Sequence, residues 1–341
     1  MKNLESSNIP IDLNLNNPDT IGNASNHLLD LDDLSTAHME TIFTLTHAMK
    51  EILNRDIKKV PALRGKSIVT LFYEPSTRTR ASFEQAGKIL SADVINISNK
   101  SSSVEKGESL YNTVKTIEAM GVDIIIIRHP HSGAPYLIAR NVKSSVINAG
   151  DGSHAHPTQA LLDIYTIANH FGTLKGLKIV IVGDILYSRV ARSNIIGLTK
   201  MGAKVVLCGP HTLLPIELLN RGNIPDIKTA FNSVEVETNI EKAITNADVV
   251  MALRVQLERQ MGGHLPSLRE YSYRFQVNEE RLTLAKPNVL VMHPGPMNEG
   301  IEISSDIAHG PKSAIEQQVA NGVAIRMAVL HWLGNTIRQE A

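Results

Sequence analysis

The sequence has little of what several protein classes require. It has one cysteine, Cys208, in 341 residues, so no disulfide and no thiolate zinc cluster can form within one chain. Aromatic residues are 4% of the total, too few for the stacking platforms of single-strand nucleic-acid binders. Lys+Arg and Asp+Glu both number 34, so the basic excess typical of nucleic-acid-binding proteins is missing.

Long apolar segments are also missing. No apolar run approaches the roughly 20 residues that a membrane-spanning helix needs. The first residues, MKNLESSNIPIDLNLNNPD, contain no apolar core of a secretory signal. Together these absences favour a cytoplasmic protein with neither a nucleic-acid nor a membrane partner.

The chain does contain a regular alternation of strand-like and helix-like segments. Its length corresponds to about two domains of roughly 150 residues each, and its 43% hydrophobic and 20% charged residues are typical of folded globular proteins. Runs rich in β-branched residues, such as SIVTLFY at 67–73, suit parallel strands that are covered on both faces. The expected strands are 67–73, 93–98, 122–129, 145–150, 177–183, 203–209, 247–253 and 288–294. The pattern predicts an α/β fold with two doubly wound parallel-sheet domains of similar size and the active site in the cleft between them.

The expected division of the chain has four parts. Residues 1–30, rich in Asn, Ser and Asp, are predicted to be a loose arm. A first domain follows over 31–153 and a second over 154–312, and a C-terminal helix over 313–341 is expected to pack back on the first domain. Ser35 is a candidate N-cap for the first helix.

The segment EPSTRTR at 74–80 carries the strongest chemical signal. It follows an expected strand and opens an expected helix over 81–90. A helix N-terminus offers unpaired N–H groups and partial positive charge, and three hydroxyl side chains and two arginines add further donors. The combination predicts an anion pocket suited to phosphate. No G-x-G-x-x-G follows the strand that ends in Val182-Gly183-Asp184, and no P-loop motif occurs.

Two polar segments lie near the ends of the next strands. RHP at 128–130 places an arginine at the end of the most apolar strand. DGSHAHPTQ at 151–159 precedes a helix, and its H-x-H spacing suits either a pair of metal ligands or a histidine that hydrogen-bonds to a carbonyl. The sequence contains no clear third metal ligand.

Two further segments follow strands of the second half. RVQ at 254–256 places Arg254 and Gln256 on the same side of an extended stretch, which suits either a carboxylate clamp or a solvated face. HPGP at 293–296 forces an irregular backbone, which either frees carbonyls for a ligand amine or makes a rigid turn.

Together and in this order, these segments resemble the catalytic chain of aspartate carbamoyltransferase, in the aspartate/ornithine carbamoyltransferase superfamily, over about residues 30–335. The motifs that carry the resemblance are FYEPSTRTRASFE, SSVEKGES, RHP, DGSHAHPTQ, VGDILYSR, RVQLER and HPGPMNEG. STRTR marks carbamoyltransferases in general, whereas RVQ and the Ser–Lys loop indicate the aspartate branch. Ornithine relatives carry a Ser-Met-Gly loop and an HCLP motif, and this chain has neither.

The resemblance implies transfer of the carbamoyl group of carbamoyl phosphate to L-aspartate, the second step of de novo pyrimidine synthesis, with no metal and no organic cofactor. The first domain would bind carbamoyl phosphate and the second aspartate. The implied catalytic residues are Arg78, Thr79, Arg128 and His156.

Further roles are implied residue by residue. The phosphate would be held by Ser76, Thr77, Arg78 and Thr79. The carbamoyl carbonyl would be polarised by Arg128, His156 and Thr79, and the carbamoyl NH2 held by Gln159 and the carbonyls of Pro294 and Gly295. The two aspartate carboxylates would be bound by Arg189, Arg254 and Gln256.

The resemblance also implies an assembly. Ser102 and Lys106 would enter the site from a neighbouring subunit, so that both substrates meet residues of two chains and the minimum unit is a homotrimer. Ser102 is chosen among three serines for its four-residue spacing to Lys106. In some relatives a long N-terminal extension joins an assembly with a dihydroorotase-like chain, and a zinc-bearing regulatory subunit would be a separate chain.

Two departures and three rival hypotheses accompany the resemblance. The N-terminal arm is longer than in the shortest relatives. Many relatives have arginine after HPGPMN, where this chain has Glu299. The rivals are a carbamoyltransferase for another amine such as ornithine, a catalytically dead structural paralogue, and a metal hydrolase built on His129/His131 and His154/His156.

Overall fold

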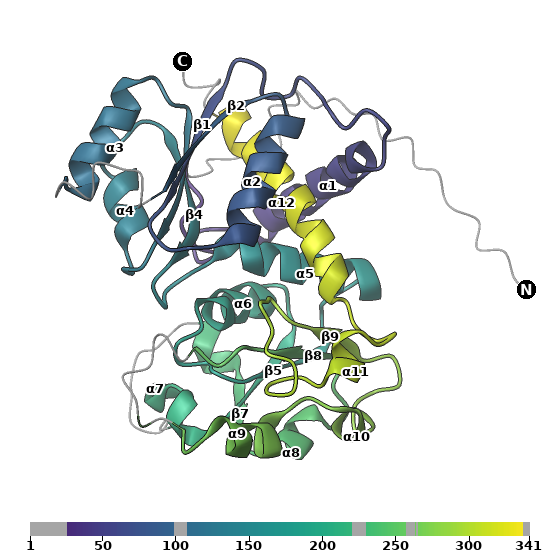
Figure 1. Ribbon diagram of the computed structural model, residues 1–341. Coiled ribbons are helices and arrows are strands. Elements are labelled where there is room, and N and C mark those ends of the chain that lie inside the picture. The colour runs from purple at the N-terminus through teal and green to yellow at the C-terminus, as the bar shows by residue number, and fades with distance from the viewer. Residues whose placement is uncertain (1–25, 99–107, 220–229, 257–262, 264, 337–341) are drawn as a thin grey trace, which may run out of the picture.

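Two parallel β-sheets, each covered by helices, form the two halves of the chain in a computed structural model (Figure 1). The structure describes residues 26–98, 108–219, 230–256, 263 and 265–336. The strand order is β2-β1-β3-β4 in the first sheet and β7-β6-β5-β8-β9 in the second. The strands are β1 (Ser67–Phe72), β2 (Asp93–Ser98), β3 (Ile124–His129), β4 (Ser145–Asp151), β5 (Lys178–Val182), β6 (Lys204–Cys208), β7 (Glu235–Glu237), β8 (Val249–Ala252) and β9 (Leu290–Met292). The predicted fold class, two parallel-sheet α/β domains, is confirmed.

Helices connect the strands, as the alternation predicts. The helices are α1 (Thr36–Leu53), α2 (Thr77–Ile89), α3 (Leu110–Ala119), α4 (Ala134–Ala139), α5 (Pro157–Phe171), α6 (Arg189–Lys200), α7 (Ile216–Leu219), α8 (Ile240–Ile244), α9 (Leu268–Phe275), α10 (Glu279–Leu282), α11 (Ser305–Ala308) and α12 (Ile315–Thr336), with short 3-10 turns at His211–Leu213 and Ala230–Ser233. Within the described residues, none of these helices combines the length and apolarity needed to cross a membrane.

The second sheet has one strand that the sequence pattern did not predict. β7 pairs in parallel with β6 at the edge of the sheet. It is three residues long and contains two glutamates, so it lacks the apolar run by which a strand is detected.

The centre of the first sheet shows how an apolar run builds a two-faced layer. Ile124, Ile125, Ile126 and Ile127 of β3 are all fully buried. Ile124 and Ile126 pack into the largest core cluster, which continues into the second domain, whereas Ile125 and Ile127 pack into a separate cluster with Val114 on α3. Successive side chains of a strand face opposite sides, and each buried isoleucine contributes about 1.5–3 kcal/mol. The run therefore stabilises both faces of the sheet.

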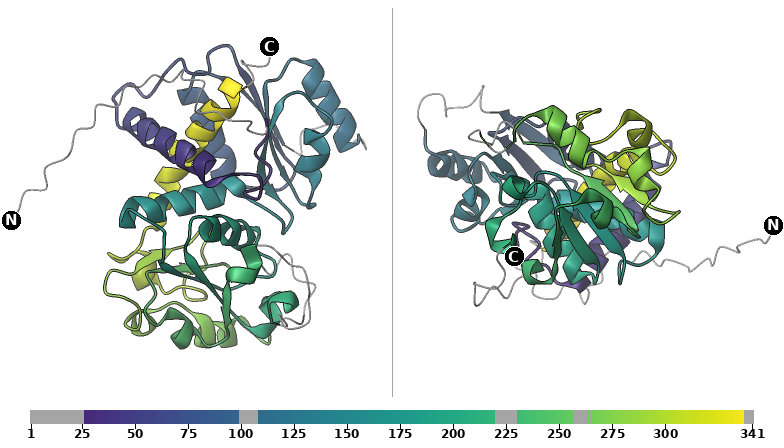
Figure 2. Two further views of the ribbon diagram at one scale, coloured as in Figure 1. Left: turned by 180° about the vertical axis from the view of Figure 1, so that it is seen from behind. Right: turned by 90° about the horizontal axis from the view of Figure 1, so that it is seen from below.

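Two long helices connect the domains. α5 leads from β4 towards the second sheet, and its residues 157–167 are all buried. α12 packs against α1 and α2 of the first domain and against α5 (Figure 2). α5 lies along the boundary between the two sheets, and α12 runs from the end of β9 up across the first domain (Figure 1), so each helix joins one domain to the other.

The described chain begins with a packed segment. The N–H of Leu28 donates to the carbonyl of Val146 at 2.9 Å, and the carbonyl of Leu28 accepts from the N–H of Asn148 at 2.9 Å. Leu28 is buried, so residues 26–30 lie along β4. The remainder of the predicted arm, 1–25, lies outside the described residues. Ser35 caps α1 as predicted, since its hydroxyl accepts from the N–H of His38 at 3.2 Å.

Candidate active site

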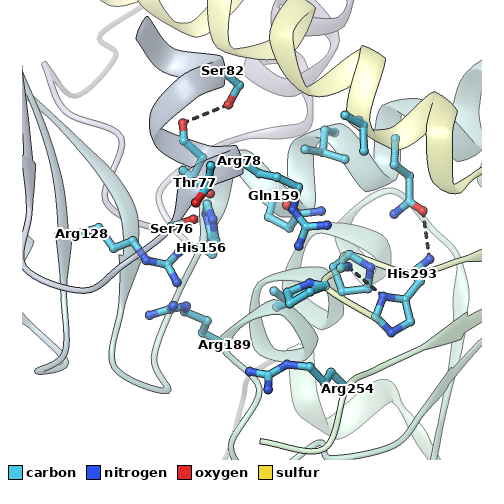
Figure 3. A pocket seen from close by; sticks show the side chains of 18 of the residues that line it. Ser76, Thr77, Arg78, Ser82, Arg128, His156, Gln159, Arg189, Arg254 and His293 are labelled. Carbon is cyan, nitrogen blue, oxygen red and sulfur yellow. Dashed lines mark hydrogen bonds between the residues drawn. The ribbon is translucent and has the colours of Figure 1, made fainter. Parts of the chain in front are cut away.

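A cavity of about 590 Å³ lies between the domains, where strands of both sheets end (Figure 3). Its walls come from the end of β3, from the loops after β1, β5, β8 and β9, from the starts of α2, α5 and α6, and from α12. The structure brings into these walls twelve of the residues singled out from the sequence: Ser76, Thr77, Arg78, Thr79, Arg128, His156, Gln159, Arg189, Arg254, Gln256, Pro294 and Gly295. Ser102 and Lys106 lie outside the described residues.

The N-terminus of α2 forms one wall. The helix begins at Thr77, four residues earlier than expected, so the STRTR residues make its first turn. Ser76 is the N-cap residue, yet its side chain makes no capping hydrogen bond. Its hydroxyl and the first N–H groups of the helix are therefore placed for an external acceptor, as in an anion site. Burial lowers the pKa of Arg78 from its usual value.

Arg78 crosses the cleft to the loop after β9. Gly295 has a left-handed backbone, with φ of +63°, and a Cβ there would lie 2.0 Å from Nη1 of Arg78. Only glycine allows this approach. The guanidinium of the first domain thus lies directly against the backbone of the second.

Glu74 joins two arginines on the other side of the cavity. Its Oε1 accepts from Nη2 of Arg128 at 2.7 Å and from Nη2 of Arg189 at 2.6 Å, and its Oε2 accepts from Nη1 of Arg189 at 3.0 Å. Gly150, with φ of +115°, leaves room for both, since a Cβ there would lie 2.9 Å from Nε of Arg189. Charge-assisted bonds of this kind hold guanidinium groups in a defined plane.

His156 and Gln159 enter the cavity from the start of α5. Pro157 occupies the first helical position, where its missing N–H costs nothing. The N–H of His156 donates to Oγ of Ser193 at 2.9 Å, which ties the start of α5 to α6. Nε2 of Gln159 donates to Oδ1 of Asp163 at 3.0 Å, one turn further along the helix.

Arg254 and Gln256 follow β8 and lie on one side of the chain, as the extended spacing predicts. Nη2 of Arg254 donates to Oε1 of Gln256 at 3.2 Å. The N–H of Gln256 donates to Oδ2 of Asp184 at 3.1 Å, so an acidic side chain after β5 fixes this loop. Both residues line the cavity, and Arg254 lies on the side of it away from Arg78 (Figure 3).

The HPGP turn after β9 is held by bonds on both sides of its histidine. The N–H of His293 donates to Oε1 of Gln318 at 2.9 Å, and its ring lies 3.2 Å from Oε1 of Glu302 through Nε2. Nδ1 of the same ring accepts from the N–H of Gly295 at 2.8 Å. His293 is thus a structural residue that shapes the turn, and the turn presents its backbone to the cavity.

The hypothesis that the histidines bind a metal ion receives no support from a metal-binding cluster in the described part of the chain. No group of three His, Cys, Asp or Glu side chains there is arranged to hold an ion. His154 instead pairs with Asp151, Nδ1 to Oδ2 at 3.1 Å, and this bond raises the pKa of His154. Within the described residues, the H-x-H motif therefore has one member in an ion pair and one in the cavity.

Some cavity residues were missed by the sequence argument. Glu74 stood in the motif without a role, and its function as a partner of two arginines depends on residues 54 and 115 positions away. Gln318 and Arg326 reach the site from α12, a helix that carries no recognisable motif. Arg326 is a single charge inside the apolar run at 323–330, and this is the signal that could have indicated it. Gln318 follows Glu316 and Gln317, so it gives no such signal.

The arrangement is suited to bind anions. Among the described lining residues, Glu74 is the one acidic side chain, facing five arginines: Arg78, Arg128, Arg189, Arg254 and Arg326. A cleft lined by one sign of charge concentrates ligands of the opposite sign. A hydroxyl-rich helix terminus lies on one side and an Arg–Gln pair on the other, so the cavity can hold two anionic groups at once.

Two family models match the chain and together cover nearly all of it. The model for "Aspartate/ornithine carbamoyltransferase, carbamoyl-P binding domain" matches residues 26–169. The model for "Aspartate/ornithine carbamoyltransferase, Asp/Orn binding domain" matches residues 175–333.

Curated relatives are similar along most of their length. An aspartate carbamoyltransferase catalytic subunit of Dehalococcoides mccartyi is 57% identical over 305 residues, 89% of this chain and 90% of the relative. Those of Roseiflexus sp. (strain RS-1) and Heliobacterium modesticaldum are 56% and 58% identical, and each comparison covers 94% of the relative and, respectively, 90% and 89% of this chain.

Solved structures share the fold. Aspartate transcarbamoylase from Trypanosoma cruzi in complex with carbamoyl phosphate is 28% identical, with a TM-score of 0.79, over 90% of this chain and 96% of that one. Ornithine carbamoyltransferase from Pyrococcus furiosus is 30% identical, with a TM-score of 0.79, over 91% and 97%. The fold alone therefore does not separate the two branches of these enzymes.

Proposed function

The chain belongs to the aspartate/ornithine carbamoyltransferase family, and we propose that it transfers the carbamoyl group of carbamoyl phosphate to the α-amine of L-aspartate. The products are N-carbamoyl-L-aspartate and phosphate. The observation that carries the proposal is the meeting, in one cavity, of the α2 terminus of the first domain with Arg254 and Gln256 of the second. Identity of 52–58% to aspartate carbamoyltransferase catalytic subunits supports aspartate as the acceptor.

The phosphate of carbamoyl phosphate is assigned to the first turn of α2. Ser76, Thr77, Arg78 and Thr79 supply hydroxyl, backbone and guanidinium donors there. The helix dipole adds partial positive charge at the same point. The support is the absence of a capping bond from the Ser76 side chain, which leaves that hydroxyl for a ligand.

The carbamoyl group is assigned to the space between α5 and the HPGP turn. Arg128, His156 and Thr79 would polarise its carbonyl oxygen. Gln159 and the carbonyls of Pro294 and Gly295 would accept from its NH2. All of these residues line the cavity.

The two carboxylates of aspartate are assigned to three side chains: Arg189, Arg254 and Gln256. Arg189 is held by Glu74 and Arg254 by Gln256. Both guanidinium groups therefore face the cavity in defined orientations. A planar guanidinium binds a carboxylate through two parallel hydrogen bonds.

The chemistry follows from these positions. A neutral amine attacks the carbamoyl carbon, so negative charge develops on the carbonyl oxygen in a tetrahedral transition state. Donors placed at that oxygen beforehand stabilise the charge without reorganisation. Binding both anionic substrates in one cleft supplies proximity. The C–O bond to the carbonyl carbon then breaks and phosphate leaves. The attacking nitrogen gives up one proton, which in the overall balance ends on the released phosphate.

The active assembly is proposed to be a homotrimer in which Ser102 and Lys106 of one chain complete the site of the next. Family membership supports this, because the SSVEKGES motif that carries both residues resembles the family's intersubunit loop. We place the enzyme in the cytoplasm, at the second step of pyrimidine synthesis. The single cysteine is compatible with a reducing compartment.

The test is an assay of the purified chain with carbamoyl phosphate and, in parallel, aspartate, ornithine and putrescine. We expect carbamoylation of aspartate alone. Product from ornithine or putrescine instead would assign the chain to another branch. Failure with all three amines, in folded protein, would favour a structural paralogue. A hydrolytic activity that a chelator abolishes would instead support the metal hydrolase hypothesis.

A further inference from the structure

A fully buried carboxylate, that of Asp163, joins three helices behind the cavity. Its Oδ1 accepts from Nε2 of Gln159 on α5 at 3.0 Å and from Nε2 of Gln318 on α12 at 2.8 Å. Its Oδ2 accepts from Nδ2 of Asn194 on α6 at 2.8 Å. Asp163 and Asn194 are completely buried, and Gln318 is 2% exposed. Three amide donors thus converge on one acceptor group.

The first consequence concerns the direction of the Gln159 amide. An ionised carboxylate only accepts hydrogen bonds, whereas a primary amide has one donor branch and one acceptor branch. Because Nε2 is bonded to Asp163, Oε1 lies on the other branch. Gln159 lines the cavity, so the group it offers a ligand is a carbonyl oxygen.

The second consequence concerns the HPGP turn. Gln318 is oriented in the same way, with its Nε2 on Asp163. Its Oε1 therefore accepts from the N–H of His293 at 2.9 Å, directly before Pro294 and Gly295. The Asp163 carboxylate thus sets the position of the Gln159 acceptor directly. Through the Gln318 amide it also sets the position of the turn that carries the two backbone acceptors.

We propose that Asp163 is a positioning residue that makes the site select a substrate with an NH2 group, rather than a methyl group, next to its reacting carbonyl. The inference rests on the proposed function, which places the carbamoyl NH2 between Gln159 and the turn. An NH2 satisfies these acceptors, whereas a methyl group leaves desolvated oxygens without partners, and that loss opposes binding.

The test compares two stable ligands that differ only at this point. Phosphonoacetamide carries NH2 on its carbonyl, and acetonylphosphonate carries CH3 there. Titration calorimetry on the wild-type enzyme is expected to give at least about tenfold tighter binding of phosphonoacetamide, the size of one or two good hydrogen bonds. Both ligands keep the phosphonate, so general damage to the site weakens both equally.

Asp163→Leu keeps a similar shape and removes every acceptor. We expect the preference to fall below about threefold, with the loss confined to phosphonoacetamide. Asn321→Leu is the matched control, because Nδ2 of Asn321 donates to Oγ1 of Thr166 at 2.9 Å between the same two helices, one turn away and outside the cavity. It should lower stability while leaving the preference unchanged.

Two further variants distinguish the hydrogen-bond acceptor from the charge, and one of them keeps the test decisive if Asp163→Leu does not fold. Asp163→Asn is expected to retain most of the preference, because its remaining oxygen can still accept from both glutamines. Gln318→Met, which cuts the link to His293, is expected to lower the preference about threefold or more. If Asp163→Leu does not fold, Gln318→Met decides the question.

The proposal is overturned if Asp163→Leu or Gln318→Met keeps the wild-type preference, or if Asn321→Leu loses it as well. It is also overturned if Asp163→Asn behaves like Asp163→Leu, because the charge would then be the active feature. These binding data are independent of turnover. A wild-type enzyme that binds both ligands but makes no carbamoyl aspartate would contradict the proposed function instead.

Discussion

Glu74 and Arg189 form a bidentate ion pair across the cleft, with 2.6 Å between Oε1 and Nη2 and 3.0 Å between Oε2 and Nη1. Glu74 follows β1 of the first sheet, and Arg189 begins α6 after β5 of the second. The pair therefore ties the two domains together at the site itself. Arg128 shares the same carboxylate, so one anion orients two cations that are assigned to different substrates.

Removing this carboxylate is expected to damage both arginine positions. In Glu74→Ala, Arg128 and Arg189 lose their common partner and repel one another in a partly buried setting. We predict at least about a tenfold loss of turnover and a higher aspartate requirement, measured by steady-state formation of carbamoyl aspartate. Glu84→Gln is the control, because Glu84 forms an exposed pair with Lys88, which contributes little. Unchanged kinetics in Glu74→Ala would contradict the role of the pair.

His156 is predicted to stabilise charge on the carbamoyl oxygen. Loss of one such donor typically costs about 2.7–4 kcal/mol, or roughly 10²–10³ in turnover. His156→Ala should therefore lower turnover far more than it weakens binding of carbamoyl phosphate, as measured by kcat and by equilibrium titration. Turnover close to that of wild type would remove His156 from the mechanism.

Arg254 is predicted to bind an aspartate carboxylate. A hydrogen bond to a charged group contributes about 1.5–3 kcal/mol, so Arg254→Ala should raise the apparent KM for aspartate at least about tenfold. Affinity for carbamoyl phosphate should change little. Arg274→Ala removes an exposed arginine that pairs with Glu270 and serves as the control. Equal loss for both substrates would indicate a folding defect.

The proposed sharing of the site between chains predicts complementation between inactive variants. Trimers of Lys106→Ala alone and of Arg254→Ala alone should be nearly inactive. In mixed trimers, some interfaces join an intact Lys106 to an intact Arg254, because cyclic interfaces are heterologous. Dissociation, mixing and reassembly should then restore part of the activity. No recovery in trimers shown by mass to be mixed would argue for a complete site within each chain.

Asp163 predicts a particular dependence of stability on pH. Burial raises its pKa to about 6, against the opposing effect of three hydrogen bonds. The folded state therefore holds a proton that the unfolded state releases near pH 4, and stability from this group falls as pH rises from about 4 to about 6. The decrease amounts to about 3 kcal/mol or less. The free energy of unfolding, measured with urea across this pH range, should decline less steeply in Asp163→Asn than in the wild-type protein. Identical declines in the two proteins would refute the raised pKa of Asp163.

Much of the fold was predictable because its signals are local. β-branched runs bounded by turns indicated eight of the strands, and Ser35 indicated a helix start through its own side chain. The composition of the STRTR segment predicted an anion site, and the structure places the segment at the start of α2 in the wall of the cavity. β7 escaped detection because its pairing with β6, and not its own apolarity, makes it a strand.

The site was predictable only as a set of residue types. The parallel strands of one sheet end at a common edge, so polar residues after β1 and at the end of β3 meet at one edge, and those after β8 and β9 meet at another. The packing of the two domains then brings these two edges together. The sequence could not indicate which of them would pair. Glu74 pairs with Arg189, which lies 115 residues away in the sequence, and Gln318 bonds to Asp163, which lies 155 residues away.

The sequence by itself determined the α/β architecture, the polar helix start at STRTR and the arginines that line the cleft, because each depends on short-range pattern and chemical type. Only the tertiary structure decided the partners of Glu74, the packed segment at 26–30 and the direction of the Gln159 amide. Those features depend on contacts between elements that are far apart in the chain. A primary amide or a carboxylate has no preferred partner until packing places one beside it and excludes water.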